Sequence, residues 1–374
     1  MITDHDSDEL PQALAAFDLG GAVEVQAYRA GHINDSYIVT AGRPDFRRRF
    51  LAQRINPVVF ADPAAIMANI VAVTRHLRAK TRQRGGDPAR QTLTLRPTVT
   101  GDWWYTAADG AVWRVYDFIE GTVCYEVAPS TGVLHAAARA FGQFARDLED
   151  FPAADLTETI PGFHDTARRH ASFVAAVAAD SVGRAQAVGR DIDFGLARAD
   201  DCQHLTGALA AGQLTLRVTH KDTKLTNVLI DPVSRVGCVV DLDTVMPGLL
   251  AYDYGDALRM GASTAGEDEA DLDRVHLSLA LVEAFTTGYL ATAGAVMTPA
   301  EIASLPWGER TMTLECGLRF LTDYLEGDRY FRTSRPGHNL DRARAQFALV
   351  AEIERHFDAL EAVVTRVSAG IGRG

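Results

Sequence analysis

A group of acidic and amide side chains between His220 and Asp243 has the spacing of a site for phosphoryl transfer. Asp222 follows His220 by two residues, and Asn227 is the fifth residue after Asp222. The next long apolar run ends on Asp241 and Asp243. In phosphoryl transfer, one carboxylate orients and deprotonates the acceptor hydroxyl, while an amide and further carboxylates hold Mg²⁺ against the phosphates. The pattern therefore predicts Asp222 as the general base and Asn227 and Asp241 as Mg²⁺ ligands.

A β-hairpin is expected to position these groups. Residues 228–230 and 236–240 are short apolar runs separated by Asp231-Pro232, which is typical of two strands joined by a turn. Asn227 and Asp241 flank this hairpin and can supply oxygen atoms to a hard, octahedral cation. We expect His220 to anchor the loop through backbone hydrogen bonds without touching the substrate.

The amino-acid sequence around these residues resembles that of the aminoglycoside phosphotransferase and choline kinase superfamily. Within that superfamily it looks most similar to the N-acetylhexosamine 1-kinases. The resembling stretches are HKDTKLTN (220–227), VVDLDTVMPG (239–248), YDYGDALRMGASTAGEDE (252–269), GHINDSY (31–37), QRINPVVFADP (53–63), FHDTARR (163–169) and GLRFLTDYLEGDRYF (317–331). The resemblance implies an α+β, protein-kinase-like fold with two lobes. The N-terminal nucleotide-binding lobe, with a small β-sheet and one helix, would span 1–118, and the mainly helical catalytic lobe would span 119–374.

The resemblance also implies ATP and Mg²⁺ as cofactors, and it directs attention to a polar turn near the N-terminus. Residues 23–29 and 37–40 are β-prone and flank this turn. Kinases cover the phosphates with such a turn, so Gly31, Asn34 and Ser36 are the candidates, although the kinase G-x-G-x-x-G pattern is absent.

The next strand, predicted over 46–55, should carry a cation that pairs with the phosphates. Protein kinases use Lys at this place, and the candidate here is Arg54, because a guanidinium can bind phosphate oxygens in a bidentate manner. The helix predicted after Asp62-Pro63 offers no acidic partner, since residues 63–86 contain no Asp or Glu. Either Asn69 serves as a neutral partner of Arg54, or the phosphates alone hold it.

Residues 116–121 pass from an apolar strand to a glycine, and we interpret them as the hinge between the lobes. The adenine would pair with the backbone there, at Phe118 and Glu120. Beyond the hinge, the sequence predicts helices over 130–150, over 314–325 and, as a single long helix, over 340–365.

The acceptor site is inferred from the resemblance alone. It implies that Asp243, Arg319 and Tyr330 contact a sugar, and that Asp253 or Asp256 braces the loop that carries the base. Whether Asp243 binds the metal or the sugar stays open at this point. The expected function is an ATP-dependent kinase acting on a sugar hydroxyl, in particular the anomeric hydroxyl of an N-acetylhexosamine. The alternatives are a kinase of another small alcohol (aminoglycoside, choline or homoserine type) and a non-catalytic kinase-like binding protein.

Composition narrows the possible partners. The chain has 374 residues, 47% of them hydrophobic, and a formal net charge of −12, which argues against a nucleic-acid partner because phosphate backbones require a basic face. Its four cysteines form no C-x-x-C pair, so we expect neither a zinc site nor disulfides. The acidic N-terminus is unlike a secretory signal, and no apolar run approaches the roughly 20 residues that span a bilayer. We expect a cytoplasmic monomer or homodimer that binds ATP and a sugar.

Overall fold

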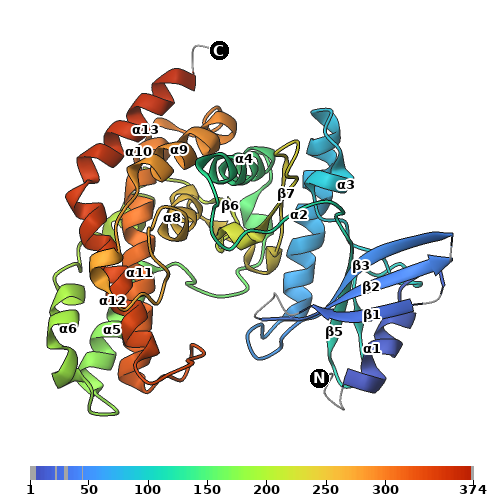
Figure 1. Cartoon of the computed structure of the whole chain (residues 1–374), viewed down its shortest axis with the longest axis horizontal. Helices are drawn as coiled ribbons and strands as arrows, with labels where there is room; N and C mark the ends of the chain where they lie inside the picture. Colours follow the sequence, from blue (N-terminus) through green and yellow to red (C-terminus); the bar gives the residue numbers. More distant parts are fainter. Residues whose placement is uncertain (1–5, 22, 29–32, 44, 372–374) are drawn as a thin grey trace.

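The computed structural model describes residues 6–21, 23–28, 33–43 and 45–371. An antiparallel sheet with two flanking helices forms one part of the molecule, and a larger, predominantly helical part lies beside it (Figure 1). The two-lobed α+β architecture predicted from the sequence is confirmed.

The sheet of the smaller part has the strand order β1-β2-β3-β5-β4, with every neighbouring pair antiparallel. Its strands are β1 (Val23–Tyr28), β2 (Asp35–Arg43), β3 (Phe46–Arg54), β4 (Tyr105–Thr106) and β5 (Val112–Asp117). Ser36 opposes Gln53, and Gln53 opposes Arg114. Because residues directly opposite each other share a face, this row lies on one face of the sheet, and Arg54 with its partner Trp113 lies on the other.

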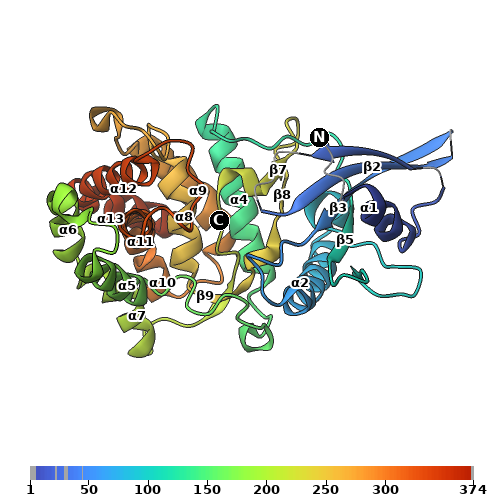
Figure 2. The ribbon, with the colours of Figure 1, turned by 90° about the horizontal axis from the view of Figure 1, so that it is seen from below.

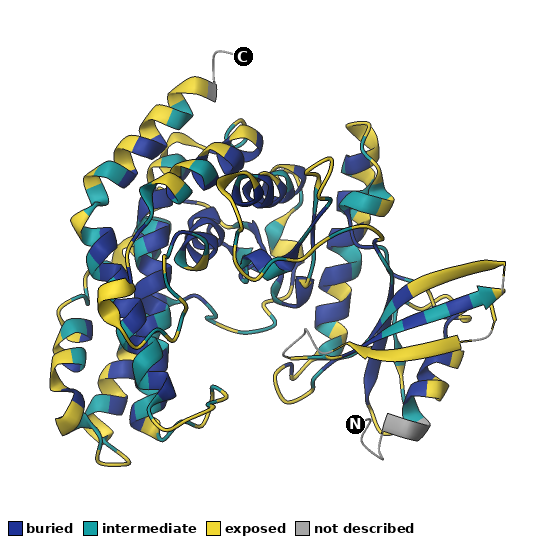
Figure 3. Ribbon diagram, viewed as in Figure 1, coloured by how far each residue is buried: buried dark blue, intermediate teal, exposed yellow. Residues whose placement is uncertain are grey.

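Helix α1 (Asp6–Ala15) covers the face that carries Trp113. Leu14 of this helix and Phe17 just after it share a buried cluster with Phe50 and Trp113 of the sheet. Strand β1, at the edge of the sheet, is exposed along its whole length (Figure 3).

Helix α2 (Pro63–Gln83) lies on the opposite face of the sheet and links the two lobes. Its predicted start is confirmed, because the Asp62 side chain caps the helix by accepting the Ala65 N–H at 3.0 Å. The apolar residues that recur at helical spacing along α2 are all buried. They are Ile66, Met67, Ile70, Val73 and Leu77. The same buried cluster contains residues of helix α4, so the hydrophobic core is continuous between the lobes.

The helical part surrounds two short ladders. Its helices are α4 (Thr131–Asp147), α5 (Thr166–Ala179), α6 (Gly189–Leu196), α7 (Asp201–Ala210), α8 (Leu250–Gly261), α9 (Leu279–Ala293), α10 (Pro299–Ala303), α11 (Leu305–Glu326), α12 (His338–Arg355) and α13 (Phe357–Ile371), and a short helix, α3 (Pro88–Gln91), precedes them. The ladders pair β6 (Arg217–Thr219) with β9 (Met246–Gly248), and β7 (Val228–Ile230) with β8 (Gly237–Val239). In Figure 2, β7 and β8 lie between helix α4 and the sheet.

The C-terminal region differs from the sequence prediction. A single helix over 340–365 was expected, but α12 ends at Arg355 and α13 starts at Phe357. The backbone of His356, at the break, leaves the helical region with φ −107° and ψ 14°. None of the helices in the described part of the chain is long and apolar enough to cross a lipid bilayer.

Candidate active site

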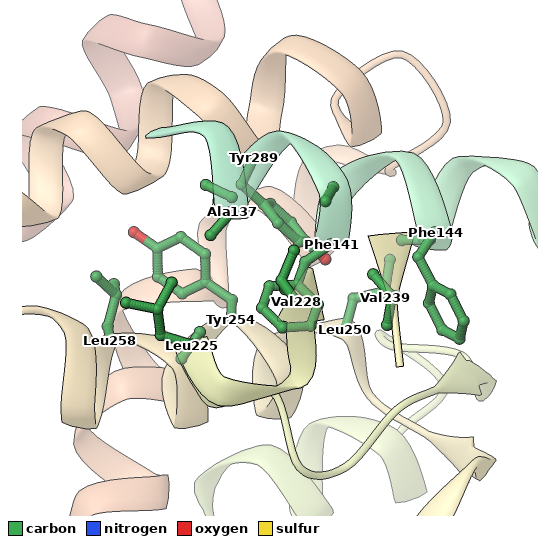
Figure 4. Close-up of a cluster of buried hydrophobic side chains, with 14 of the residues drawn as sticks. Ala137, Phe141, Phe144, Leu225, Val228, Val239, Leu250, Tyr254, Leu258 and Tyr289 are labelled. Carbon is green, nitrogen blue, oxygen red and sulfur yellow. The ribbon is translucent and has the colours of Figure 1, made fainter. Parts of the chain in front are cut away.

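The β7–β8 hairpin is seated on the hydrophobic core of the helical lobe. Val228 and Val239 oppose each other across the hairpin and share a buried cluster with Phe141 of α4 and Tyr254 of α8 (Figure 4). The hairpin predicted from the sequence is confirmed. Because its apolar residues are held in the core, the polar residues that flank it have fixed positions.

The loop before the hairpin brings Asp222 and Asn227 into contact. The Asn227 amide Nδ2 donates to the Asp222 backbone carbonyl at 2.8 Å and to its Oδ2 at 2.9 Å. The Lys224 ammonium lies 2.9 Å from the same Oδ2. Burial acts to raise the pKa of Asp222, but the charge and hydrogen bond of Lys224, with smaller contributions from His220 and Asn227, together outweigh it, so the pKa lies below its ordinary value. Asp222 is therefore an ionised carboxylate that can accept a proton. Sequence reasoning missed Lys224, although its spacing of two residues from the base is visible in the sequence.

His220 is fully buried, and its ring joins two segments of backbone. Nε2 lies 2.8 Å from the carbonyl oxygen of Val240, and the N–H of Asp222 donates to Nδ1 at 3.2 Å. Because a carbonyl only accepts, the ring carries its proton on Nε2. The rings of Phe141 and Phe144 meet it edge-on. His220 thus ties the loop to the residue that follows β8 and is turned away from solvent.

Two aspartates of α8 accept hydrogen bonds from backbone N–H groups of the same loop. Asp253 accepts the backbone N–H groups of His220 and Lys221, each at 2.8 Å, and Asp256 accepts that of Thr223 at 2.9 Å. Lys221 has a φ of 63°, a left-handed conformation that is unfavourable for a non-glycine residue. The two carboxylates supply the hydrogen bonds that hold the loop in this strained shape.

Asp241 ends the hairpin in an environment that favours a bound cation. Burial, followed by the negative charges of Asp243 and Asp222, raises its pKa to about 6. Its carboxylate and the Asn227 Oδ1 accept no hydrogen bond from a described residue, so these oxygens are available as ligands. Across the described residues, no three His, Cys, Asp or Glu side chains form a ready metal cage. Mg²⁺ needs only one or two carboxylates together with substrate phosphates, and the donor set of Asn227 and Asp241 fits that requirement.

Asp243 forms a buried ion pair with Arg114 of β5. The side chains are 4% and 1% exposed, and Arg114 Nη1 donates to Asp243 Oδ1. Asn34 Nδ2 donates to the other oxygen at 2.6 Å, and Gln53 accepts two further N–H groups of the guanidinium. Both oxygens of Asp243 are therefore occupied by protein donors. The expectation that Asp243 contacts sugar hydroxyls stays a prediction, because an ionised carboxylate can accept further hydrogen bonds.

Sequence reasoning missed Arg114, although a signal was present. The residue interrupts an otherwise apolar strand, Val-Trp-Arg-Val-Tyr, and a charge at a buried strand position requires an ionised partner. Burial acts to lower the pKa of Arg114, but Asp243, Tyr116 and Asp241 together outweigh it and the pKa is raised. The guanidinium remains charged inside the protein.

The predicted phosphate-binding turn is built into this network. Gly31 lies outside the described residues. Asn34 uses its Oδ1 to accept the Asn56 N–H at 3.0 Å, and the buried Ser36 hydroxyl accepts from Gln53 Nε2 at 3.0 Å. The side chains of Asn34 and Ser36 thus bind protein groups and hold the turn against Asp243. The predicted phosphate contacts, which would come from backbone N–H groups of this turn, stay a prediction.

Arg54 points away from this site, which corrects its predicted role. It lies on the α1 side of the sheet, where its guanidinium is 3.5 Å from both Glu9 and Asp109. The predicted neutral partner, Asn69, is occupied elsewhere, because its amide donates to the carbonyls of Thr157 and Val245. Side chains alternate along a strand, so Gln53 faces the site and its neighbour Arg54 cannot.

The hinge residues are also engaged by protein partners. The Phe118 N–H donates to the Arg49 carbonyl at 3.1 Å, and the Glu120 carbonyl accepts from Arg90 at 3.1 Å. Arg49 also pairs with the Glu120 carboxylate and lies 4.1 Å from the Phe118 ring centroid. These contacts engage the Phe118 N–H and the Glu120 carbonyl, whereas the Phe118 carbonyl and the Glu120 N–H have no hydrogen-bond partner among the described residues. Pairing of adenine with the backbone of Phe118 and Glu120 therefore stays a prediction.

Arg319 and Tyr330 lie together at the end of α11. The Arg319 guanidinium carbon is 5.8 Å from the ring of Tyr330 and 5.7 Å from that of Phe163. Tyr330 is 70% exposed, and its backbone N–H is held by the carboxylate of Asp323 at 2.8 Å. The structure thus brings together two of the three residues that the resemblance assigned to the acceptor.

Two hydrogen bonds connect this region to the loop that carries Asp222. His164 Nδ1 lies 2.9 Å from Glu315 of α11, and its Nε2 lies 3.0 Å from the carbonyl oxygen of Lys221. Glu315 is one helical turn before Arg319. The sequence analysis did not assign a role to His164 or Glu315, although His164 is in one of the resembling stretches.

Solved structures share this fold over nearly the whole chain. A microcompartment-associated aminopropanol kinase superposes with a TM-score of 0.60 at 15% identity, covering 94% of this chain and 98% of its own. An aminoglycoside phosphotransferase from Alicyclobacillus acidocaldarius gives 0.60 at 17% identity, covering 96% of each chain. A choline kinase from Cryptosporidium parvum gives 0.56 at 13% identity, covering 92% of each. The fold is therefore that of the kinase-like phosphotransferases.

Fold and sequence agree on the class of protein, a small-molecule phosphotransferase with two kinase-like lobes. Residues 24–294 match the phosphotransferase enzyme family, and the chain belongs to that family.

Proposed function

We propose that this protein is an ATP- and Mg²⁺-dependent kinase that phosphorylates a sugar hydroxyl, in particular the anomeric hydroxyl of an N-acetylhexosamine. The observation that carries the proposal is the contact between Asp222 and Asn227 beside the hairpin that ends on Asp241. This arrangement supplies a base and two oxygen ligands within one rigid unit.

In this mechanism, Asp222 accepts the proton of the acceptor hydroxyl. The hydroxyl oxygen forms a bond to the γ-phosphorus of ATP while the bond to the β,γ-bridging oxygen breaks, and ADP leaves. Lys224 keeps Asp222 ionised and lies where it can stabilise the transferred phosphoryl group. Asn227 and Asp241 would hold Mg²⁺, which supplies charge neutralisation for the phosphates.

A sugar is favoured over a cationic acceptor by the charges near Arg319. Choline recognition requires aromatic faces open to a quaternary ammonium, but the rings of Phe163, Tyr330 and Phe331 already surround the guanidinium of Arg319. Aminoglycosides are polycations, and a guanidinium repels them. A sugar hydroxyl can accept hydrogen bonds from Arg319, while Tyr330 offers both a ring and a hydroxyl.

An ADP-release screen tests the proposal. The wild-type protein is assayed with Mg²⁺ and ATP against N-acetylhexosamines, aminoglycosides, choline and homoserine, and Asp222→Asn gives the background. Coupling of ³¹P to the anomeric proton of the product identifies the phosphorylated oxygen. Turnover of choline, homoserine or an aminoglycoside above every sugar would reject the sugar assignment.

A further inference from the structure

Two arginines beside the loop that carries Asp222 lack a carboxylate partner. Arg169 of α5 donates from Nη2 to the Phe163 carbonyl at 3.1 Å, while its Nε is buried without a partner among the described residues. Arg319 of α11 makes no hydrogen bond or ion pair with any described residue. Each contacts Phe163, one at its carbonyl and the other at its ring, 5.7 Å from the centroid.

The buried carboxylate of Glu315 lies near both arginines but pairs with neither. Its Oε1 lies 2.9 Å from His164 Nδ1, and its Oε2 accepts the Thr166 hydroxyl at 2.6 Å. Burial lowers the pKa of Arg169, and the positive charge of Arg319 lowers it further. The two guanidiniums therefore repel each other, and the single charge of Glu315 cannot balance both.

Most of the described arginines that are buried or half-buried pair with a carboxylate. In the same lobe, Arg198 pairs with Glu354 at 2.8 Å and Arg344 with Asp191 at 2.9 Å. The protein has a net charge of −12, so carboxylates are plentiful. Two adjacent guanidiniums that pair with none of them can bind a negatively charged group from outside the protein. A carboxylate or a phosphate suits a guanidinium best, because its oxygens match the arrangement of the N–H donors.

The position of Arg169 and Arg319 relative to the proposed base suggests which molecule they bind. His164, which follows Phe163, bonds to the carbonyl of Lys221, the residue before Asp222. Lys221 is 5% exposed, and its ammonium forms no hydrogen bond with a described residue, although the charges of Glu158, Asp253 and Glu315 act on it. Lys221, Arg169 and Arg319 are thus cations near this loop in addition to Lys224, which is already paired with the base.

We propose that the acceptor carries an anionic group, a carboxylate or a phosphate, which Arg169 and Arg319 hold while Asp222 deprotonates its hydroxyl. This inference rests on the proposed sugar-kinase function and narrows its substrate class to acidic sugars. The anion adds no step to the reaction. It orients the acceptor, so the arginines act as specificity-determining residues.

Matched acceptors test the inference. We would compare N-acetylglucosamine with its 3-O-lactyl ether, with the methyl ester of that ether, and with its 6-phosphate. We expect one acidic sugar to exceed N-acetylglucosamine by about tenfold or more in kcat/KM, as for a charge-assisted contact of about 1.5–3 kcal/mol. If the lactyl ether is preferred, its ester should lose the advantage, and the lactyl and phosphate arms tell carboxylate from phosphate.

Variants separate the arginine pair from a general charge effect. Arg169→Gln should remove the preference for the acidic sugar and leave kcat/KM for N-acetylglucosamine within about twofold, and Arg169→Lys should restore part of the preference. Arg319→Gln should also remove the preference, but it should lower kcat/KM for N-acetylglucosamine as well, because Arg319 donates to sugar hydroxyls in the proposed function. Arg168→Gln, an exposed neighbour on α5, removes the same charge and should keep the preference. Equal use of acidic and neutral sugars by the wild type, or equal losses for both in Arg169→Gln, would overturn the inference.

A binding measurement keeps this inference distinguishable from the proposed function. If no sugar is phosphorylated, the sugar-kinase proposal fails by itself. Calorimetric titration of the Asp222→Asn protein with gluconate, glucose 6-phosphate and neutral glucose then tests whether the protein has an anion-binding site. Saturable binding of an acid that is lost in Arg169→Gln supports the anion site, and absence of such binding rejects it.

Discussion

The guanidinium of Arg114 on β5 and the carboxylate of Asp243, two residues beyond Asp241, form an ion pair that is buried between the lobes. Gln53 and Asn34 complete the hydrogen bonds of this pair from β3 and from the turn before β2. The pair connects the sheet to the hairpin that carries the proposed metal ligand. A shift of the sheet would therefore move the backbone around Asp241.

Breaking this pair should destabilise the protein strongly. Arg114→Met leaves Asp243 buried and unpaired, and such a loss typically costs about 3–5 kcal/mol. The control is Arg54→Met on the other face of the sheet. The partners of Arg54 are partly solvated, so this substitution should lower the free energy of unfolding by about 1 kcal/mol or less. Urea unfolding measures both. The double variant Arg114→Met/Asp243→Leu should recover much of the loss, because no buried charge remains. An additive effect of the two substitutions would contradict the pairing.

Asp222→Asn should lower kcat by about 10²–10⁴, the usual range for the loss of a general base. The amide retains the size of the side chain but cannot take the proton of the acceptor. ATP affinity, measured by calorimetry, should change little because Asp222 does not contact the nucleotide in the proposed mechanism. Turnover close to that of the wild type would show that another group acts as the base.

Asp241→Ala should abolish the Mg²⁺ dependence of nucleotide binding, because it removes a charged ligand of the proposed metal site. The control is Asp231→Ala, which changes a carboxylate at the turn of the same hairpin, where it accepts backbone N–H groups of Val233 and Ser234. Titrations with ATP at several Mg²⁺ concentrations provide the measurement. Unchanged Mg²⁺ dependence in Asp241→Ala would move the metal role to another residue.

Glu309 in α11 should make the stability of the protein depend on pH. Its side chain is 1% exposed, neither oxygen has a partner among the described residues, and burial raises its pKa to about 8. The folded state therefore holds this proton more tightly than the unfolded state, in which the acid has an ordinary pKa of about 4.3. The free energy of unfolding contributed by this group falls as pH rises between these values, by up to about 1.4 kcal/mol per pH unit.

Glu309→Gln, which removes the titrating proton, tests this prediction. Denaturant unfolding at pH 5, 6, 7 and 8 should show the variant gaining stability relative to the wild type as pH rises. The control is Glu361→Gln, an exposed glutamate of α13, which should leave the pH profile unchanged. A constant difference between Glu309→Gln and the wild type at all four pH values would contradict the prediction.

Local sequence determined the elements that depend on near neighbours in the chain. The spacing of Asp222 and Asn227 specified a loop whose ends meet, and the cap at Asp62 with the apolar period after it specified α2. The turn at Asp231-Pro232 between two apolar runs specified the hairpin. These features arise from hydrogen bonds and side-chain periodicity over a few residues, so they can be read without knowledge of the fold.

Only the tertiary structure decided which face of strand β3 is directed toward the candidate active site. Arg54 and Gln53 are adjacent in β3, and the sequence shows that they point to opposite faces but not which of these α1 covers. The packing of α1 turned Arg54 away and placed Gln53 beside Arg114. The partner of Asp243 likewise lies 129 residues away in the chain. Such pairings are set by how the lobes pack, because a buried charge can be satisfied by any opposite charge that the fold brings near it.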